Sequence, residues 1–442
     1  MSNRRPGIAF LVPKTNRIAR RPALIKLWRE SVRFRESSFF FPLPNLALLT
    51  LAGLVDNTFE LEYHDENIDK IELGDNCQIA AITSMTCQAN RAYRLASMYR
   101  KKGLHVVLGG MHPTVIPEEA MNHADTVIAG EAEELWPAFL KDYKAGRPKK
   151  LYQSSKKSPY NLKKAPVPRY DLIRPQDYRA MPVQVGRGCP LGCEFCSVEV
   201  VHGRKYRHKE IEQVLDEIKV IKKVWQTRRP RIFFTDDNLH LHREVTSRLL
   251  EKLIPLKINW MAQMDISVGR DQELLSLMAK SGCSQLLIGF ESLNRANLDS
   301  VQPNGVKQKH LAEYGKLIKN IQSYGIRVLG MFIIGLDQDR QDVFQQLRDF
   351  IFDNDLHDAQ ITIQTPLPGT RLYSRMQKEG RLLEPVDWQR CNFFYVNFLP
   401  LRHTARQLVR GQSWLYQQIH CDEAVARRQK YWLDHYRNRI KS

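Results

Sequence analysis

The chain has 442 residues, which is long enough for two or three domains, each with its own core. Its composition, 43% hydrophobic and 26% charged, is that of a soluble globular protein, and it lacks the run of eighteen apolar residues that predicts a membrane-spanning helix. The net charge of +19 fits either an anionic partner, such as nucleic acid or a membrane surface, or a broadly solvated basic surface.

The first 140 residues alternate short apolar runs with helix-like segments. We expect strands at residues 8–13, 59–63, 77–83, 105–110 and 126–129, and helices at residues 45–55 and 90–102. Strands that alternate with helices form parallel sheets through right-handed crossovers. The pattern predicts an α/β domain over residues 1–141 with a five-stranded, flavodoxin/Rossmann-like sheet, whose ligand lies beyond the carboxyl ends of the strands.

Small and polar residues stand at three of these carboxyl ends. They are Thr83 and Ser84, Gly109 and Gly110, and Gly130 and Glu131. Glycine lets a bulky ligand approach the backbone, and hydroxyl groups can bond to its polar edge. Any sheet of this type ends its strands in glycine and serine, so the signal is weak by itself. Of the nearby histidines His64 and His112, we favour ordinary surface or core roles.

Residues 15–41 form a basic and aromatic insertion after the first strand, with Trp28, Phe34 and Phe39 to Phe41 among its aromatic residues. It fits a lid over the ligand, a membrane-facing patch or a packed loop. Residues 142–180 are rich in lysine and proline and predict an extended linker between two domains.

Three cysteines, Cys189, Cys193 and Cys196, lie within eight residues, directly after a predicted strand at residues 181–185. The neighbouring glycines allow the backbone to fold tightly, so that all three thiols reach one pocket. Three thiolates suit zinc or an iron–sulfur cluster. Structural zinc would need a fourth ligand, such as His202 or His208, whereas a four-iron cluster with three cysteines leaves one iron open. With eight cysteines in all, the chain fits metal chemistry in a reducing compartment, so we expect a cytoplasmic protein.

The strand-and-helix alternation resumes after the cysteines. Further strands are expected at residues 231–234, 259–262, 285–289, 328–334 and 358–363, with helices at residues 210–225, 272–281 and 308–324. Together with the strand at 181–185, this predicts a partial (β/α)6 TIM-type barrel over residues 181–375. Active sites of such barrels lie at the carboxyl ends of the strands. Those ends carry Asp236, Asp237, Asn238, Gln263, Glu291, Ser292 and Gly335.

Residues 376–442 predict a helical tail, with helices at residues 404–420 and 422–440. Residues 412–419 are placed to cap the barrel cavity. Cys283, Cys391 and Cys421 lack the spacing of a cluster and are interpreted as packing thiols.

The cysteine stretch, with Phe195 directly before the third cysteine, resembles the signature of the radical S-adenosylmethionine (SAM) superfamily. The likeness extends over roughly residues 6–420 and is closest to the subgroup with an N-terminal cobalamin (B12)-binding domain. It implies that the three cysteines hold a [4Fe-4S] cluster, and that Phe195 and the polar residues at the barrel strand ends bind SAM. It also implies that Thr83, Ser84, Gly109, Gly110, Gly130 and Glu131 contact cobalamin. Residues 65–69 lack the Asp-x-His-x-x-Gly motif, so no histidine ligand to cobalt is expected from that loop.

The resemblance implies an enzyme that cleaves SAM to a 5′-deoxyadenosyl radical and, as the first hypothesis, C-methylates an unactivated carbon of a small-molecule or lipid substrate. A cyclase or ring-rearranging enzyme of the same subgroup, an RNA-modifying methylthiotransferase-like enzyme and a zinc-stabilised nucleic-acid-binding protein are the alternatives. The expected partners are the substrate, an electron donor such as flavodoxin or ferredoxin, and a peripheral membrane contact. Nucleic acid is not expected as a partner, because no appended RNA-binding domain is visible.

Overall fold

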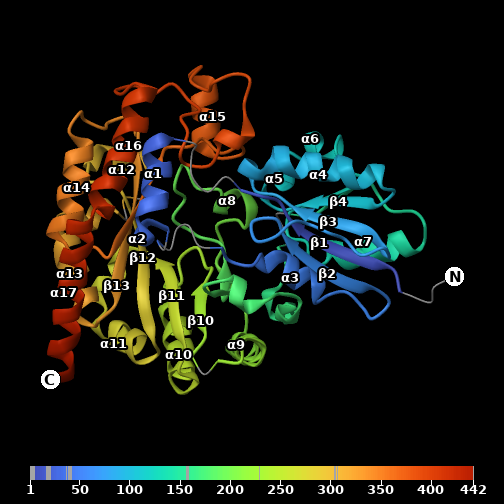
Figure 1. The fold of residues 1–442 in the computed structure, drawn as a ribbon, viewed down its shortest axis with the longest axis horizontal. Coiled ribbons are helices and arrows are strands. Elements are labelled where there is room, and N and C mark those ends of the chain that lie inside the picture. The colour runs from blue at the N-terminus through green and yellow to red at the C-terminus, as the bar shows by residue number, and fades with distance from the viewer. Residues whose placement is uncertain are drawn as a thin grey trace.

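The computed structural model describes residues 5–15, 21–35, 37, 42–155, 159–227, 229–302, 305 and 307–441, with side chains up to residue 434. Two parallel sheets lie side by side, and each is accompanied by helices (Figure 1). The N-terminal sheet forms one half of the molecule. The other half contains the second sheet and the helices that end the chain.

The N-terminal sheet has the strand order β2-β1-β3-β4-β5-β6, and every pair in it is parallel. Its strands are β1 (Gly7–Val12), β2 (Glu60–Asp65), β3 (Cys77–Thr83), β4 (His105–Gly109), β5 (Thr126–Ala129) and β6 (Leu151–Gln153). The first five match the predicted strands within two residues. The sixth corrects the expected five-stranded sheet, because part of the predicted linker pairs with β5 at the edge.

Side chains alternate between the two faces of this sheet, as the strand period of two requires. On one face, Ala9 and Leu11 pack against α4 (Ala89–Lys101). On the other, Ile8 and Phe10 pack with residues of α3 (Leu46–Ala52) and α7 (Leu135–Lys144). Two short helices, α5 (Met111–Val115) and α6 (Pro117–Met121), follow β4. The sheet is therefore buried on both faces, and its open ends are left for a ligand.

The second sheet is the predicted partial barrel of six parallel strands, in the order β14-β13-β12-β11-β10-β7. The strands are β7 (Met181–Val183), β10 (Arg231–Phe234), β11 (Asn259–Met264), β12 (Cys283–Glu291), β13 (Arg327–Ile334) and β14 (Asp358–Ile363). The helices around it are α9 (Ile211–Trp225), α10 (Arg243–Leu253), α11 (Gln272–Lys280), α12 (Arg295–Val301), α13 (Tyr314–Ser323), α14 (Val343–Asp353) and α15 (Arg371–Lys378).

The inward-facing side chains of the barrel form three layers. An apolar cluster of Met261, Leu287, Leu329, Phe233 and Met331 fills the middle. Polar residues occupy the layer at the carboxyl ends of the strands, and a second polar layer lies at the amino ends. The apolar layer therefore separates two cavities that open at opposite ends of the barrel.

The basic N-terminal insertion packs against the C-terminal tail. It contains α1 (Pro22–Glu30) and α2 (Val32–Arg35), and α1 contacts α16 (Ala405–His420). Leu24 and Phe34 are fully buried, and the Phe34 ring lies 5.3 Å from the Tyr416 ring, between centroids. Residues 21–35 therefore form a packed segment, which is one of the three structures predicted for this insertion. The predicted aromatic residues Phe39 to Phe41 and the basic residues from Arg17 to Arg20 lie outside the described residues.

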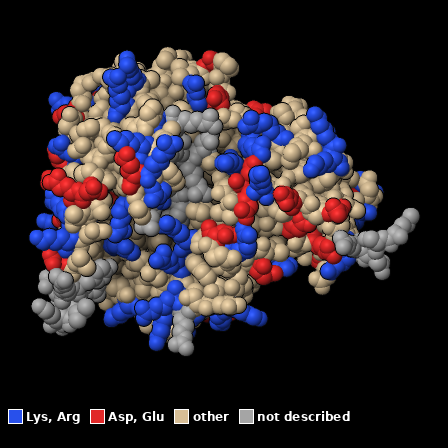
Figure 2. Space-filling view, in the orientation of Figure 1, with Lys and Arg blue, Asp and Glu red and all other residues tan. Residues whose placement is uncertain are grey.

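Basic side chains are dispersed over the face seen in Figure 2, with acidic side chains among them. This distribution fits a solvated basic surface. Among the described residues, no helix has both the length and the apolar character needed to cross a bilayer. The last helix, α17 (Asp422–Lys441), follows α16 along the outside of the barrel.

Candidate functional site

The three clustered cysteines lie on the loop after β7, between the short hairpin strand β8 (Gly186–Arg187) and α8 (Val198–Val201). Gly188 has φ +93°, and a Cβ there would lie 2.3 Å from the Lys205 carbonyl oxygen, so the loop requires glycine at this position. The loop is fastened to the barrel at Glu194, whose amide donates to the Val301 carbonyl (2.8 Å) and whose carboxylate accepts from Arg375 (2.7 Å).

All eight cysteines of the chain are free thiols. Cys189, Cys193 and Cys196 line one cavity of about 360 Å³ at the carboxyl ends of the barrel strands. Burial raises the pKa of Cys189 to about 11 and that of Cys196 to about 12. Buried thiols of this kind become thiolates when a metal centre compensates their charge. Three of them around one cavity therefore fit a metal cluster.

The zinc alternative has no fourth ligand in the predicted places. His202 lines a different cavity, where its Nδ1 lies 3.9 Å from Glu131 Oε1. The Nδ1 atom of His208 bonds to the Lys209 carbonyl at 2.8 Å. Among the described residues, no group of three or more His, Cys, Asp and Glu is arranged for a single metal ion. Three cysteines around one cavity match the donor set of an iron–sulfur cluster that keeps one iron open.

Five of the predicted SAM-binding residues line the same cavity. They are Phe195, Asp237, Asn238, Gln263 and Glu291. Met331, Phe332 and Ile333 of β13 line it too and give it an apolar side. The cavity thus combines carboxylate and amide groups with an apolar wall, which suits a molecule with an ammonium group and a flat ring.

Glu291 holds an unusual backbone conformation at the end of β12. Its φ is +64°, and the Ser292 amide donates to the Phe290 carbonyl across it at 2.8 Å. A positive φ in this three-residue turn is costly for a residue with a side chain, so the backbone at Glu291 is held in a strained conformation. The Glu291 carboxylate pairs with Lys307, which is 7% exposed, so this ion pair lies buried in the cavity wall.

Asp236 and Asp237 sit at the end of β10 and have different surroundings. Asp236 is buried, accepts from the Val185 amide (2.9 Å) and the Gly186 amide (2.5 Å), and does not line the cavity. Its role is to tie β10 to the segment that leads into the cysteine loop. Asp237 lines the cavity, and burial raises its pKa to about 6. Asn238 donates to Asp265 Oδ2 at 2.8 Å and so is held in a fixed orientation.

Two further predicted SAM residues lie beside the cavity and do not line it. The Ser292 hydroxyl accepts from the Asn294 amide at 3.1 Å and shapes the start of α12. The Gly335 amide donates to Asp339 Oδ2 at 2.7 Å, and a Cβ there would meet Leu408 of the tail at 2.9 Å. Their roles toward SAM stay predictions.

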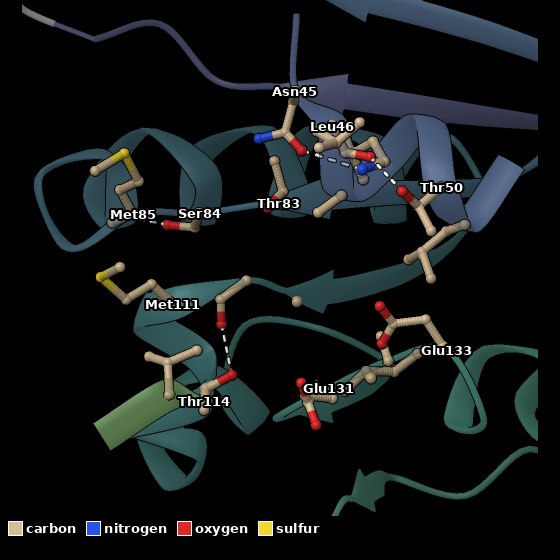
Figure 3. A pocket seen from close by; sticks show the side chains of 18 of the residues that line it. Asn45, Leu46, Thr50, Thr83, Ser84, Met85, Met111, Thr114, Glu131 and Glu133 are labelled. Atoms are coloured by element: carbon tan, nitrogen blue, oxygen red, sulfur yellow. Dashed lines mark hydrogen bonds between the residues drawn. The ribbon is translucent and has the colours of Figure 1, made fainter. Parts of the chain in front are cut away.

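A second cavity, of about 550 Å³, lies at the carboxyl ends of the N-terminal sheet. All six residues predicted to contact cobalamin line it: Thr83, Ser84, Gly109, Gly110, Gly130 and Glu131. The close-up in Figure 3 shows Thr83, Ser84 and Glu131 from these strand ends together with the side chains of Asn45, Leu46 and Thr50 from the α3 region. Much of the remaining lining is apolar. A wide, largely apolar cavity with hydroxyl groups at one end fits a bulky cofactor with an amide-bearing rim.

Glycine at two of these positions is a structural requirement. Gly110 has φ +96°, and a Cβ there would lie 2.6 Å from Thr83 Oγ1. Gly130 has φ +98°, and a Cβ there would lie 1.9 Å from Ser154 Oγ. Both positions let a ligand approach the backbone closely.

His64 and His112 have the ordinary roles that we favoured. His64 Nε2 lies 3.0 Å from Glu62 on the edge strand. His112 is fully buried and bonds to the Tyr93 hydroxyl at 3.0 Å. The loop of residues 65–69 folds on itself, with Asp65 accepting from the Asn67 amide at 2.9 Å, and does not line the cavity.

A network of buried charges joins the two halves of the molecule. Glu131 and Glu133 follow β5, and Arg187 belongs to the hairpin that precedes Cys189. Arg187 reaches Glu131 Oε1 at 3.1 Å and Glu133 Oε1 at 2.6 Å, and Arg207 reaches Glu131 Oε1 at 3.0 Å. Burial raises the pKa of Glu131, but Arg207 and Arg187 outweigh it, so the net pKa falls and Glu131 stays ionised.

The same short segment forms the wall between the two cavities. Pro182, Gln184 and Arg187 line the larger cavity, and Cys189 lines the smaller one two residues later. The wall continues through α8, where Val198 lines the smaller cavity and Val201 and His202 line the larger one. The two cavities are therefore neighbours.

The sequence did not identify Lys307 and Arg187 as site residues. Lys307 lies far along the chain from the cysteines, and its position beside Glu291 depends on the packing of the loop after α12. Arg187 stands inside the cysteine stretch. A basic residue between Gly186 and Gly188, directly before the first cysteine, is the sequence signal that could have identified it.

Comparison with known families accounts for this arrangement. Residues 183–351 match the Radical SAM superfamily, residues 37–140 match the B12 binding domain, and residues 370–442 match a domain of unknown function, DUF4070. The first match spans the cysteine loop and the barrel strands β10 to β13, and the second spans β2 to β5 of the N-terminal sheet.

Relatives match over most of the chain. The bacteriochlorophyllide d C-12(1)-methyltransferase of Chlorobaculum tepidum is 30% identical over 388 residues, which cover 87% of this chain and 84% of that protein. The hopanoid C-2 methylase of Rhodopseudomonas palustris is 25% identical over 351 residues, covering 77% and 66%. The anaerobic magnesium-protoporphyrin IX monomethyl ester cyclase of Cereibacter sphaeroides is 24% identical over 375 residues, covering 78% and 60%.

The fold is shared with the radical SAM methyltransferase TsrM from Kitasatospora setae, solved with cobalamin and a [4Fe-4S] cluster. The match has a TM-score of 0.63 at 14% identity and covers 95% of this chain and 86% of that one. The chain therefore belongs to the radical SAM superfamily, among its members with an N-terminal B12-binding domain, and it is an enzyme whose cofactors are a [4Fe-4S] cluster, SAM and cobalamin.

Proposed function

We propose that this enzyme transfers a methyl group to an unactivated carbon of an apolar, ring-containing small molecule or lipid. When bound, the cluster and SAM supply a 5′-deoxyadenosyl radical, and cobalamin supplies the methyl group. The task of the chain is to hold the three cofactors at fixed positions and to keep water away from them.

The observation that carries this proposal is that one short segment lines both cavities. Its residues Cys189, Cys193 and Cys196 line the barrel cavity, and Gln184, Arg187 and His202 line the other. A carbon placed at the junction could be approached from both cofactor sites. Close placement of reacting groups is among the largest contributions that a protein makes to such a reaction.

The turn after β14 supports a substrate position at this junction. Thr365 and Leu367 line the barrel cavity. Gly369, with φ +81°, packs between the two halves, since a Cβ there would lie 2.7 Å from Val115 of α5 and 3.1 Å from Val200 of α8. The turn thus contacts the N-terminal domain, the cysteine loop and the cavity at once, which suits a segment that shapes the substrate.

The apolar character of the substrate is inferred from the wall and from the relatives. Leu191, Phe195, Val198, Leu367 and Phe393 give the barrel cavity an apolar side. Two of the relatives are named as acting on a bacteriochlorophyllide and on a hopanoid, which are both ring systems.

The test is a methyl-transfer assay with SAM that carries a deuterated methyl group, using the protein reconstituted anaerobically with iron, sulfide and cobalamin. A chlorin-type macrocycle and a hopanoid are the first substrates. A product with one deuterated methyl group on carbon, absent with Cys193→Ala, supports the proposal. Transfer of the labelled methyl group to oxygen or nitrogen contradicts it. A product with an altered ring and no labelled methyl group contradicts it as well.

Ring formation without methyl transfer is the second candidate, because a cyclase is among the relatives. In the same assay a cyclase would form 5′-deoxyadenosine and an altered ring without the label.

We also propose an acidic electron-transfer protein, such as flavodoxin or ferredoxin, as the partner that reduces the cluster. The net charge of +19 favours association with an acidic surface. The rate of reduction should then fall as salt is added, and a rate independent of salt would argue against an electrostatic complex.

A further inference from the structure

A third cavity, of about 590 Å³, lies at the opposite end of the barrel from the cysteines. It is bounded by the amino ends of the strands, including Arg231 of β10, Asn259 of β11 and Arg327 of β13. The apolar layer in the barrel interior separates it from the cofactor sites, although Met261 of that layer also reaches its lining. Residues of α17 close one side. The cavity has no part in the chemistry proposed above.

Its lining is strongly cationic. Five arginines line it, namely Arg33, Arg179, Arg231, Arg327 and Arg428, and Asp358 is the only carboxylate among the described lining residues. The pKa of His357 falls to about 3, mainly because the ring is buried; Arg327, Arg428 and Arg33 lower it further, and Asp358 raises it. Five guanidinium groups around one space raise the local positive potential, which attracts anions.

Two buried side chains at this cavity have unfilled hydrogen-bonding capacity. Arg428 is 7% exposed; its Nη2 donates to the Ile419 carbonyl at 2.5 Å, but its buried Nη1 has no partner. His420 is 3% exposed, and neither ring nitrogen has a hydrogen-bond partner, since Asp358 Oδ1 is 3.6 Å from Nε2. Leaving a buried charged donor unpaired is expensive, so a ligand that accepts hydrogen bonds would stabilise the fold here.

We propose that this cavity binds a small phosphorylated anion. Guanidinium groups match phosphate oxygens in pairs of parallel hydrogen bonds, and the volume exceeds that of a lone phosphate, which leaves room for a phosphoester. The phosphate group could belong to a soluble metabolite or to a lipid headgroup. The second source is included because Leu433, which lines the cavity, is 56% exposed, and Val32, next to Arg33, is 54% exposed.

The inference is independent of the proposed function and is tested by binding alone. Titration of the full-length holoenzyme with inorganic pyrophosphate in a calorimeter, at constant ionic strength, should give saturable binding. Arg231→Gln and Arg428→Gln should each weaken it by about tenfold or more, since each removes a charged donor. The matched control is Arg248→Gln, an exposed arginine on α10 outside the cavity. Arg428 is buried and its variant could misfold, but Arg231 is exposed and its variant keeps the test decisive.

Sedimentation with phosphatidylcholine vesicles that contain phosphatidic acid separates the two sources. Cosedimentation that is reduced by Arg231→Gln and by pyrophosphate, but not by Arg248→Gln, identifies a lipid headgroup; saturable pyrophosphate binding without cosedimentation identifies a soluble anion. Absence of saturable binding at millimolar pyrophosphate, or equal affinity in the wild type and Arg231→Gln, would overturn the proposal.

Discussion

The two cofactor cavities are lined by different kinds of residue. The cavity of the N-terminal sheet is lined by glycine backbone, hydroxyl groups and apolar side chains, and its glycines at positions 110 and 130 have positive φ. The barrel cavity is lined by three thiols and by the buried Glu291–Lys307 pair, in which Glu291 has a positive φ. The first site makes room for a cofactor that brings its own reactive atom. The second must supply ligands and charges itself.

This difference predicts different responses to mutation. Ligand and charge changes in the barrel should abolish chemistry, whereas changes of shape in the N-terminal cavity should release one cofactor and leave the other in place. The charged contact between Glu131 and Arg187 should affect both sites without emptying either.

The largest effect is expected from loss of a cluster ligand. Cys193→Ala should reduce iron to the background level and abolish SAM cleavage, because two thiolates cannot hold a four-iron cluster. Cobalamin absorption bands should remain. Iron analysis and 5′-deoxyadenosine production are the measurements, with the exposed Cys421→Ala as control. Retention of iron by Cys193→Ala would refute the ligand assignment.

The second largest effect is expected from the buried ion pair of Lys307 and Glu291. Lys307→Met leaves the Glu291 carboxylate without its partner and should lower the free energy of unfolding by about 3–5 kcal/mol. The double variant Lys307→Met with Glu291→Gln should recover most of that loss, because no charge is left buried alone, yet it should not recover SAM cleavage. Urea denaturation measures the free energy of unfolding, and 5′-deoxyadenosine production measures SAM cleavage. A double variant as unstable as the single one would show that the pair is not the cause.

On the other side, Gly110→Ala should release cobalamin and spare the cluster. Its Cβ would collide with Thr83, whereas Gly103→Ala, also at positive φ (+83°), would place its Cβ in open space. Both variants carry a backbone cost of roughly 1–3 kcal/mol, and Gly110→Ala adds the collision with Thr83 and the Ser84 backbone, so it should be the less stable of the two. Only Gly110→Ala should weaken cobalamin binding, by about tenfold or more, in an absorption titration. Equal cobalamin affinity in both variants would mean that the strand end does not contact the cofactor.

The smallest effect is expected at the contact between the halves. Arg187→Lys keeps the charge but cannot bond to Glu131 and Glu133 together. Iron and cobalamin contents should be unchanged, while methyl transfer should slow by about tenfold, as for other residues that orient a metal site indirectly. Arg174→Lys, in an exposed ion pair with Asp177, is the control. A wild-type rate in Arg187→Lys would leave the network with a purely structural role.

Most of the fold could be predicted because its strands are short apolar runs with regular helices between them. β3 and β5 were predicted to the residue, and all six barrel strands were found. β6 was missed because Leu151–Gln153 is brief and lies among lysines and prolines. The helices α1 and α2 were missed because basic residues interrupt their apolar residues, such as Leu24 and Phe34. These apolar residues are buried when the two helices pack against the C-terminal tail.

The site was predictable where its residues share a strand end or a short loop, as the cysteines and Thr83 do. Partners that meet only in the folded chain, such as Lys307 with Glu291, leave no local pattern. Asp236 shows the converse: its position at a strand end was identified, but its carboxylate is occupied by two backbone amides.

The most direct measurement is the anaerobic absorption spectrum of the protein reconstituted with iron, sulfide and hydroxocobalamin, with metal analysis of the same sample. The account predicts about four irons per chain together with retained corrin bands, because the two cavities are separate and both are complete. Zinc in place of iron, without corrin bands, would contradict it.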